Sequence, residues 1–408
     1  MSGGESKLER VILHVDVNNA FLSWTAVERL KNGETLDIRT IPAIIGGDET
    51  QRKGVVLAKS PIAKKFGIQT GEPIYFAKKK CPNLQMFQGD FKVYYKYSNA
   101  LYNLLCEYTD KIERFSIDEC FMDMTHYLRG REAYQIAVEI NKRVKEQFGF
   151  TVNIGIANNK LLAKMASDFE KPDKIHTLYK HEIEKKMWSL PVSELFMVGK
   201  KSLPKLEKMR IKTIGNLAKK DKKELIKAFG KYGNTIWEYA NGIDNSEVVY
   251  EEPDPKCIGN SITLPYDFSD IEKLQEVLLS ITEQTTYRLR KHDMYASVVN
   301  VQLKTNEFKV SSHQRKLETP TNSTKIIYEE AKKLLQELFR GTPIRLIGIR
   351  VDGLSHKDEI QLSIFDTKPN EKQEKLDKVI DSLKDKYGYN TITRAGKINL
   401  NETPDKLK

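Results

Sequence analysis

Three acidic residues stand where predicted strands end, and their types and spacing suit chemistry on phosphates. Asp16 lies near the end of the β-rich segment VILHVDV (Val11–Val17), and Asp118 with Glu119 lies in a predicted turn between two other strands. Adjacent carboxylates in a hairpin are costly unless a cation neutralises them. Hard oxygen ligands suit Mg²⁺ or Mn²⁺, and two such ions can clamp the attacking and leaving oxygens of a phosphoryl displacement. An arbitrary Asp-Glu pair more often decorates an exposed hairpin, so the surrounding elements decide the interpretation.

The elements around these acids predict an α+β sheet with carboxylates at its rim. Asn18 to Leu30 reads as a turn followed by a helix. IERFSIDECFMDM (Ile112–Met124) and TVNIGIA (Thr151–Ala157) predict further strands, and apolar residues at i, i+4 spacing predict a helix from about Tyr134 to Phe148. An order of strand, helix, strand and helix is typical of such a sheet.

The rest of the chain predicts a small helical module and a second α/β domain. Leu190 to about Gly242 is lysine-rich, with glycines between short helical patterns. The charged segment Tyr250–Lys256 carries two prolines and predicts an interdomain tether. Beyond it, a helix is expected over Asp270–Lys291 and strands over Ser297–Thr305 and Arg345–Leu354.

Composition narrows the class of protein. A chain of 408 residues has room for two to four domains. Its net charge of +11 favours polyanionic partners, either nucleic acid or an anionic membrane. No basic amphipathic segment favours the membrane surface, and no apolar run predicts a signal peptide or a membrane span. Four scattered cysteines without zinc-like spacing are expected in a reducing cytosol, so a cytoplasmic location is predicted.

Three motifs in order resemble those of the Y family of DNA polymerases, especially its bacterial members. They are HVDVNNAF (His14–Phe21), SIDE (Ser116–Glu119) and GIANNKLLAKMASDFEKPD (Gly155–Asp173). Three motifs in the right order and spacing are far more specific than any one of them.

The resemblance implies a right-hand polymerase, a multidomain α+β protein whose palm carries a ferredoxin-like sheet. The implied domains are the palm at 1–20 and 87–177, small fingers at 21–86, a helical thumb with a helix-hairpin-helix at 178–244, a linker at 245–255, an α/β little finger at 256–354, and a clamp-binding peptide with a C-terminal tail at 355–408.

The resemblance also implies the catalytic site. Asp16, Asp118 and Glu119, with the backbone carbonyl of Val17, would ligate two Mg²⁺ ions, for which Mn²⁺ can substitute. The nucleophile would be the primer 3′-hydroxyl. Phe21 stands where the family places an aromatic steric gate that excludes a nucleotide 2′-hydroxyl.

Triphosphate contacts are implied for Lys64 and Lys171, but the match in this region is incomplete. Lys64 replaces a usual arginine and Pro61 a usual tyrosine. Beside the metal site, Asn18 replaces a frequent aspartate that is not a ligand, and Ala20 a frequent aromatic residue. None of these departures removes a catalytic ligand.

Two further contacts are implied outside the palm. In the thumb, a hairpin at Gly199, Lys200 and Lys201 would bind backbone phosphates of DNA, although Lys201 replaces a usual second glycine. Past the little finger, QLSIF resembles the peptide by which bacterial polymerases dock on the β subunit sliding clamp. Its expected clamp-binding residues are Gln361, Leu362, Ile364 and Phe365.

The implied activity is template-directed DNA synthesis of low fidelity on damaged DNA, from dNTP to primer, without a proofreading exonuclease. Expected partners are primer–template DNA, dNTPs and the clamp, with no membrane and a monomeric chain. Two alternatives stay open. A related two-metal enzyme such as a nucleotidyl cyclase would lack the thumb and clamp peptide, and a non-catalytic DNA-binding scaffold would not need all three acids.

Overall fold

The computed structural model describes residues 9–47, 54–251, 253–359, 371–388 and 391–392. It divides into two compact units, of residues 1–47 and 55–252 and of residues 48–54 and 253–408. The break after residue 252 lies inside the predicted linker. The finer domain boundaries remain predictions.

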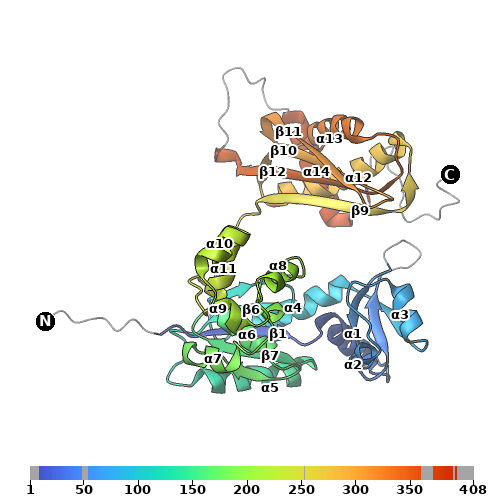
Figure 1. Ribbon diagram of the computed structural model, residues 1–408. Coiled ribbons are helices and arrows are strands. Elements are labelled where there is room, and N and C mark those ends of the chain that lie inside the picture. The colour runs from blue at the N-terminus through green and yellow to red at the C-terminus, as the bar shows by residue number, and fades with distance from the viewer. Residues whose placement is uncertain (1–8, 48–53, 252, 360–370, 389–390, 393–408) are drawn as a thin grey trace. The chain divides into compact units, whose positions relative to one another are not determined.

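A five-stranded sheet organises the first unit, in the order β5-β6-β1-β7-β8 (Figure 1). The central strand β1 is antiparallel to both β6 and β7, while β8 is parallel to β7. The strands span Ile12–Val17 (β1), Ile112–Arg114 (β5), Glu119–Asp123 (β6), Val152–Ala157 (β7) and Ile175–Thr177 (β8). The predicted strands are confirmed, with one refinement: Glu119 begins β6 and is not in the turn, because it pairs with Asp16 across the sheet.

Side chains of β1 point alternately to the two faces of the sheet, and each face is covered by different helices. Leu13 packs in one cluster with helices α4 (Phe91–Cys106) and α5 (Ala133–Phe148). Ile12 packs in another with α6 (Lys160–Asp168). Because successive side chains of a strand point to opposite faces, the even-numbered residues of β1 lie toward α6.

Helix α6 lies unusually close to β7. A Cβ on Gly155 would lie 1.9 Å from the carbonyl oxygen of Ala163, so only glycine permits this approach. The helix begins at an N-cap, since the Asn159 side chain accepts a hydrogen bond from the Leu162 amide at 2.8 Å. Strand and helix therefore pack in close contact on the face of the sheet that carries Asp16.

The predicted fingers form a small sheet in the order β3-β2-β4. Ile44 packs on one face with Ile74, whereas Ile45 packs on the other with Leu22. The elements are α1 (Ala20–Lys31), η1 (Ile38–Thr40), β2 (Ala43–Gly46), β3 (Val56–Lys59), α2 (Pro61–Lys65), α3 (Ile74–Lys80) and β4 (Gln85–Gln88).

The predicted thumb is a set of short helices that share a core with α6. They are η3 (Lys180–Glu182), α7 (Ile183–Lys186), η4 (Val192–Glu194), α8 (Leu203–Lys208), α9 (Ile214–Ala218), α10 (Lys222–Phe229) and α11 (Lys231–Ala240). This confirms the helical module predicted over about 190–242.

The second unit is a four-stranded antiparallel sheet in the order β11-β10-β12-β9, packed with helices α12 and α13 (Figure 1). Its elements are β9 (Cys257–Phe268), α12 (Ile271–Lys291), β10 (Met294–Thr305), β11 (Val310–Thr321), α13 (Thr324–Leu338), β12 (Ile344–His356) and η5 (Lys357–Glu359). The helix predicted over Asp270–Lys291 and the strands predicted over Ser297–Thr305 and Arg345–Leu354 are confirmed.

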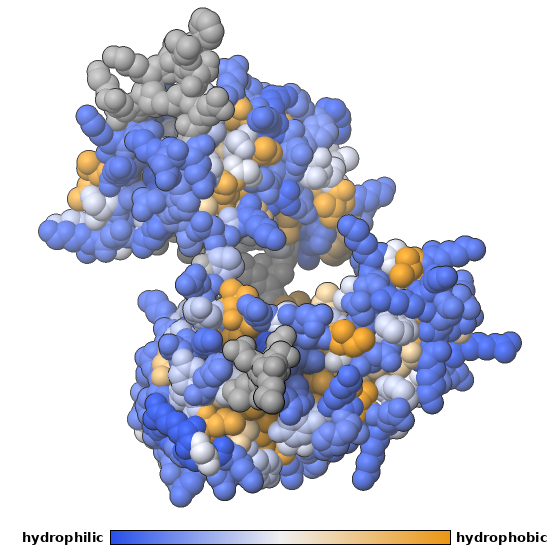
Figure 2. All heavy atoms as spheres, turned by 90° about the vertical axis from the view of Figure 1, so that its left-hand side faces the viewer, coloured by the Kyte–Doolittle hydropathy of each residue, from blue (hydrophilic) through white to orange (hydrophobic). Residues whose placement is uncertain are grey.

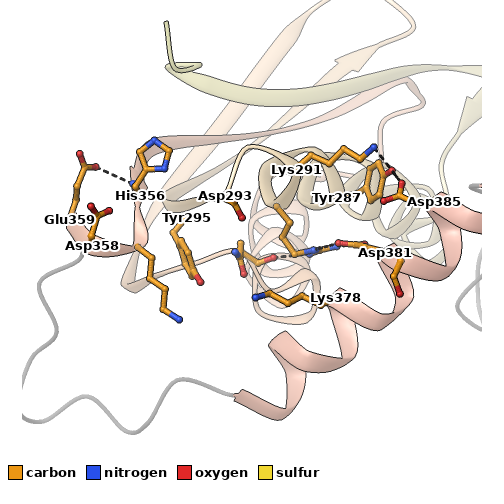
Figure 3. Close-up of a pocket in the computed structure, with 14 residues that line it drawn as sticks. Tyr287, Lys291, Asp293, Tyr295, His356, Asp358, Glu359, Lys378, Asp381 and Asp385 are labelled. Carbon is orange, nitrogen blue, oxygen red and sulfur yellow. Dashed lines mark hydrogen bonds and ion pairs between the residues drawn. The ribbon is translucent and has the colours of Figure 1, made fainter. Parts of the chain in front are cut away.

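A last helix, α14 (Glu371–Tyr387), docks on the second unit through charged residues. Asp381 accepts two hydrogen bonds from Arg290 of α12, at 2.6 and 2.9 Å. In Figure 3, Asp381 and Asp385 of α14 lie on the side that faces α12, which carries Lys291. A polar hollow of about 760 Å³ opens beside this contact, in the second unit, whereas the predicted catalytic acids lie in the first.

Hydrophilic side chains cover most of the face drawn in Figure 2, as the high lysine content predicts. Among the described helices, none combines the length and apolar character needed to cross a bilayer.

Candidate active site

The backbone brings the three predicted acids to one end of the central sheet. Asp16 of β1 and Glu119 of β6 are direct cross-strand partners. The Val17 amide donates a hydrogen bond to the Asp118 carbonyl at 3.0 Å, which places Asp118 beside them. Asp16 is only 5% exposed, because its side chain lies on the face of the sheet that α6 covers.

Two lysines pair with these acids. Lys164 of α6, itself nearly buried, donates a hydrogen bond to Glu119 at 2.7 Å. Lys171, in the loop after α6, pairs with Asp16 and lies 2.7 Å from Asp168. Asp118 is partly exposed and accepts a hydrogen bond from the Ser116 hydroxyl at 2.6 Å. The lysines thus supply positive charge where the sequence predicts metal ions.

Burial gives Asp16 unusual electrostatics. Loss of solvation raises the pKa of Asp16 to about 6, with Lys171 acting against the rise and Glu119 and Asp118 adding to it. Burial by itself would lower the pKa of Lys171, but Asp16 and Asp168 hold that pKa well above its ordinary value. The site therefore concentrates negative charge that needs a cation.

The donor set fits a hard divalent cation, but the side chains as they stand do not enclose one. Within the described ranges, no three acidic, histidine or cysteine side chains lie close enough to hold a metal ion. Asp16, Asp118, Glu119 and the Val17 carbonyl nevertheless offer oxygen ligands at one place. A cation bound by these acids would compete with Lys164 and Lys171 for the carboxylate oxygens.

Phe21 lies two residues into α1, in a cluster of aromatic rings. It stacks on Tyr94 of α4, with centroids 4.5 Å apart and planes inclined by 17°. Phe91 meets it edge-on at 5.9 Å, and the Tyr94 hydroxyl lies 3.2 Å from the Thr25 hydroxyl. Because Tyr94 is fully buried, the half-buried Phe21 ring rests on a rigid support.

Known proteins match nearly the whole chain. The impB/mucB/samB family matches residues 15–168, and its C-terminal domain matches residues 255–364. DNA polymerase IV of Clostridium acetobutylicum is 52% identical over 388 residues, which cover 95% of this chain and 98% of that protein. DNA polymerase IV of Alkaliphilus oremlandii is 38% identical over 401 residues, covering 95% and 99%. A solved Y-family DNA polymerase chimera of Dbh and Dpo4 superposes with a TM-score of 0.75 at 25% identity, covering 85% of this chain and all of that one.

This chain belongs to the Y family of DNA polymerases. The predicted resemblance and the multidomain α+β fold are thereby confirmed. The roles of individual residues in this Y-family chain remain predictions.

The departures from the family pattern have structural explanations in part. Pro61 occupies the first turn of α2, where no amide hydrogen is needed, behind the N-cap Ser60. Lys64 is exposed on the same short helix. Asn18 is buried and hydrogen-bonded through both ends of its amide. Nothing in the structure explains Ala20.

The predicted DNA contacts of the thumb lie in an exposed turn before α8. The Ser202 amide donates to the Gly199 carbonyl at 2.9 Å, and a Cβ on Gly199 would meet open space. Lys200 and Lys201 are both exposed. The predicted clamp-binding residues Gln361, Leu362, Ile364 and Phe365 lie outside the described residues.

Sequence reasoning missed several residues of this Y-family site. Lys164 carried one usable signal, since it stands within the apolar helical run KLLAKMA. Tyr94 follows Phe91 at helical spacing, which predicts only a shared face. Nothing local indicated Asn153, which lies fully buried in β7 and bonds to Asn18.

Proposed function

We propose that this DNA-directed DNA polymerase performs low-fidelity, translesion synthesis by two-metal nucleotidyl transfer from dNTP to a primer 3′-hydroxyl. The observation that carries the proposal is the pairing of buried Asp16 with Glu119, with Asp118 beside them, at one end of the central sheet. Relatives that match almost the whole chain are named DNA polymerase IV.

Asp16, Asp118, Glu119 and the Val17 carbonyl would hold two Mg²⁺ ions, with Mn²⁺ able to substitute. When bound, such ions lower the pKa of the attacking hydroxyl and stabilise the pyrophosphate leaving group. Lys171 would pass from Asp16 to the triphosphate, with Lys64 as a second contact. Phe21 would exclude a 2′-hydroxyl because its ring is supported by Tyr94 and cannot retreat.

Low fidelity is inferred from small fingers, whose two cores are formed by short strands and helices. The proposed partners are primer–template DNA, dNTPs and the β sliding clamp, the last through Gln361, Leu362, Ile364 and Phe365. Gly199, Lys200 and Lys201 would contact DNA phosphates. The protein would act as a cytoplasmic monomer without a proofreading exonuclease.

Primer extension tests the proposal. Wild-type protein with Mg²⁺ and each dNTP should extend a primed template by template-directed addition. Asp118→Ala/Glu119→Ala should abolish extension while still binding the primer–template, because the acids act in catalysis. Purified wild type that binds primer–template tightly yet never extends it would instead support a non-catalytic scaffold.

A further inference from the structure

The loop that carries Lys171 is held by two buried asparagines from different parts of the chain. Asn18 lies in the turn between β1 and α1, and Asn153 lies in β7 with no exposed surface. The Asn18 amide nitrogen donates a hydrogen bond to the Asn153 side-chain oxygen at 3.0 Å. This bond joins residues 135 positions apart.

The orientation of the Asn153 amide follows from its other bonds. Its nitrogen donates to the carbonyls of Ser167, at 2.8 Å, and Glu170, at 2.6 Å. Its oxygen also accepts from the Lys174 amide at 3.2 Å. Exchanging the side-chain nitrogen and oxygen would place the oxygen against two carbonyl oxygens and the nitrogen against an amide nitrogen. Asn153 therefore presents an acceptor to Asn18.

Asn18 must then present a donor to Asn153 and an acceptor elsewhere. Its oxygen accepts from the Asp173 amide and from the Thr151 hydroxyl, each at 2.9 Å. Only a side-chain amide serves both ends at once. An aspartate would oppose a carboxylate oxygen to the Asn153 oxygen in a buried site, which is costly.

These bonds grip the chain on both sides of Lys171. Asn153 holds the carbonyl of Glu170, and Asn18 holds the amide of Asp173. The Asp173 carboxylate is in turn fixed by Lys145 of α5 at 2.5 Å. Lys171, which remains 40% exposed, is thereby placed against Asp16 with its outer side open.

We propose that Asn18 and Asn153 are a matched pair of positioning residues that sets Lys171 for the incoming nucleotide triphosphate. The inference rests on the proposed function, since it assumes that Lys171 contacts the triphosphate. The pairing also explains why residue 18 is an asparagine, since its side-chain nitrogen must donate to the Asn153 oxygen on the neighbouring strand. Neither asparagine touches the reacting atoms; both act through the loop.

The test measures dNTP binding apart from chemistry, on a primer ended by a dideoxynucleotide. Asn18→Asp should weaken dNTP binding about tenfold or more, the scale of a lost charge-assisted contact, and change primer–template affinity less than twofold.

Two comparisons distinguish an effect on the position of Lys171 from a general disturbance of the fold. In a Lys171→Met background, Asn18→Asp should have almost no further effect on dNTP affinity, because the residue through which it acts is gone. Asn158→Asp is the matched control. Asn158 is half-buried and donates to the Arg10 carbonyl at 3.0 Å, away from the loop, so this variant should keep wild-type dNTP affinity.

The outcomes are distinct. The inference would be overturned if Asn18→Asp kept wild-type dNTP affinity. It would also be overturned if Asn18→Asp weakened dNTP binding in the Lys171→Met background by the same factor as in the wild type. Either result would leave the polymerase proposal intact. A wild type that neither binds dNTP nor extends a primer would overturn the proposed function and this inference with it. If Asn18→Asp does not fold, Asn153→Ser decides, since it releases the Glu170 carbonyl and should show the same selective loss of dNTP affinity.

Discussion

Asp16 and Glu119 at the site are each paired with a lysine of opposite charge. Asp16 is buried beside two other carboxylates, and Lys171 and Lys164 offset that charge. A buried carboxylate is strongly destabilising without a cation beside it, so the two lysines stabilise these acids. Under the proposed function, the same acids would then serve as metal ligands.

Replacing Phe21 by alanine should admit ribonucleotides. The ring rests on Tyr94 at 4.5 Å and cannot move aside, so removing it opens the space that a 2′-hydroxyl needs. We expect the ratio of kcat/KM for rNTP over dNTP to rise about tenfold or more. Single-nucleotide incorporation measures it. Tyr94→Phe is the control: it keeps the ring beneath Phe21 and should keep the discrimination between rNTP and dNTP. An unchanged ratio in Phe21→Ala would contradict the predicted role of Phe21 as a steric gate.

Gly155→Ala should destabilise the first unit by about 1–3 kcal/mol or more, the range for overpacking. The new methyl group would lie 1.9 Å from the Ala163 carbonyl oxygen, so β7 and α6 must separate. Urea unfolding measures the loss. Gly199→Ala is the control, because its Cβ meets open space and its stability should stay within about 0.5 kcal/mol of wild type.

At the scale of elements, helix contacts set the rigidity of the site. Helices α1 and α4 meet again seven residues beyond Phe21, where Glu28 accepts hydrogen bonds from Lys96, at 2.9 Å, and from the Tyr97 hydroxyl, at 2.8 Å. The hydrogen bond from Lys96, helped by that from Tyr97, lowers the pKa of Glu28 below its ordinary 4.5, against the effect of burial.

Glu28→Gln should therefore cost stability in a pH-dependent way. A carboxyl group whose pKa is lowered by folding stabilises the protein above its unfolded pKa and stops doing so as pH falls through the folded value. We expect a loss of about 1 kcal/mol at pH 7 that shrinks below pH 4.5. Denaturant melts across pH measure it. Glu146→Gln breaks only an exposed pair and should cost almost nothing at any pH.

Helix α14 reverses the usual pattern of a docked helix. Asp377 is buried and lies 3.8 Å from Arg290, whereas Leu376 and Val379 are about half exposed. The predicted amphipathic stretch from Leu376 to Leu383 is thus helical, and its one fully buried side chain is the charged Asp377. The buried charges must be matched to keep the helix in place.

Arg290→Met should release α14. It removes the guanidinium that pairs with Asp381 and lies near Asp377, at a cost of about 3–5 kcal/mol if the helix stays docked, so undocking is favoured. Hydrogen exchange over residues 373–387 should become fast while β10 and β12 stay protected. Lys291→Met breaks only an exposed pair with Asp385, and equal release by that control would contradict the special role of Arg290.

For the whole molecule, the net charge of +11 predicts binding dominated by DNA phosphates. Affinity for primer–template should fall by about 10³ or more between 50 and 200 mM salt if six or more phosphates are contacted. Lys200→Ala/Lys201→Ala should reduce the slope of log K against log salt by about two, as expected for two lost phosphate contacts. A salt-independent affinity would rule out this mode of binding.

Local patterns along the chain were sufficient for strands β1, β6, β7, β10 and β12 and for helices α1, α5 and α12, but they gave no prediction of β9, β11, α4 or α13. Alternating apolar residues predict a strand wherever it lies, and the motifs around Asp16 and Asp118 need no knowledge of packing. The palm strand β1 and helix α12 accordingly appear within one residue of the predicted limits.

Only the tertiary structure shows which distant residues the acids and Asn18 contact. Lys164 meets Glu119 across 45 positions, and Asn18 meets Asn153 across 135, because the register of β1 against β6 and β7 and the close approach at Gly155 place α6 over the acids. No local pattern carries such pairings, since they arise from steric fit and hydrogen-bond matching between distant segments. For the same reason, only the tertiary structure revealed the charge pairs between α12 and α14.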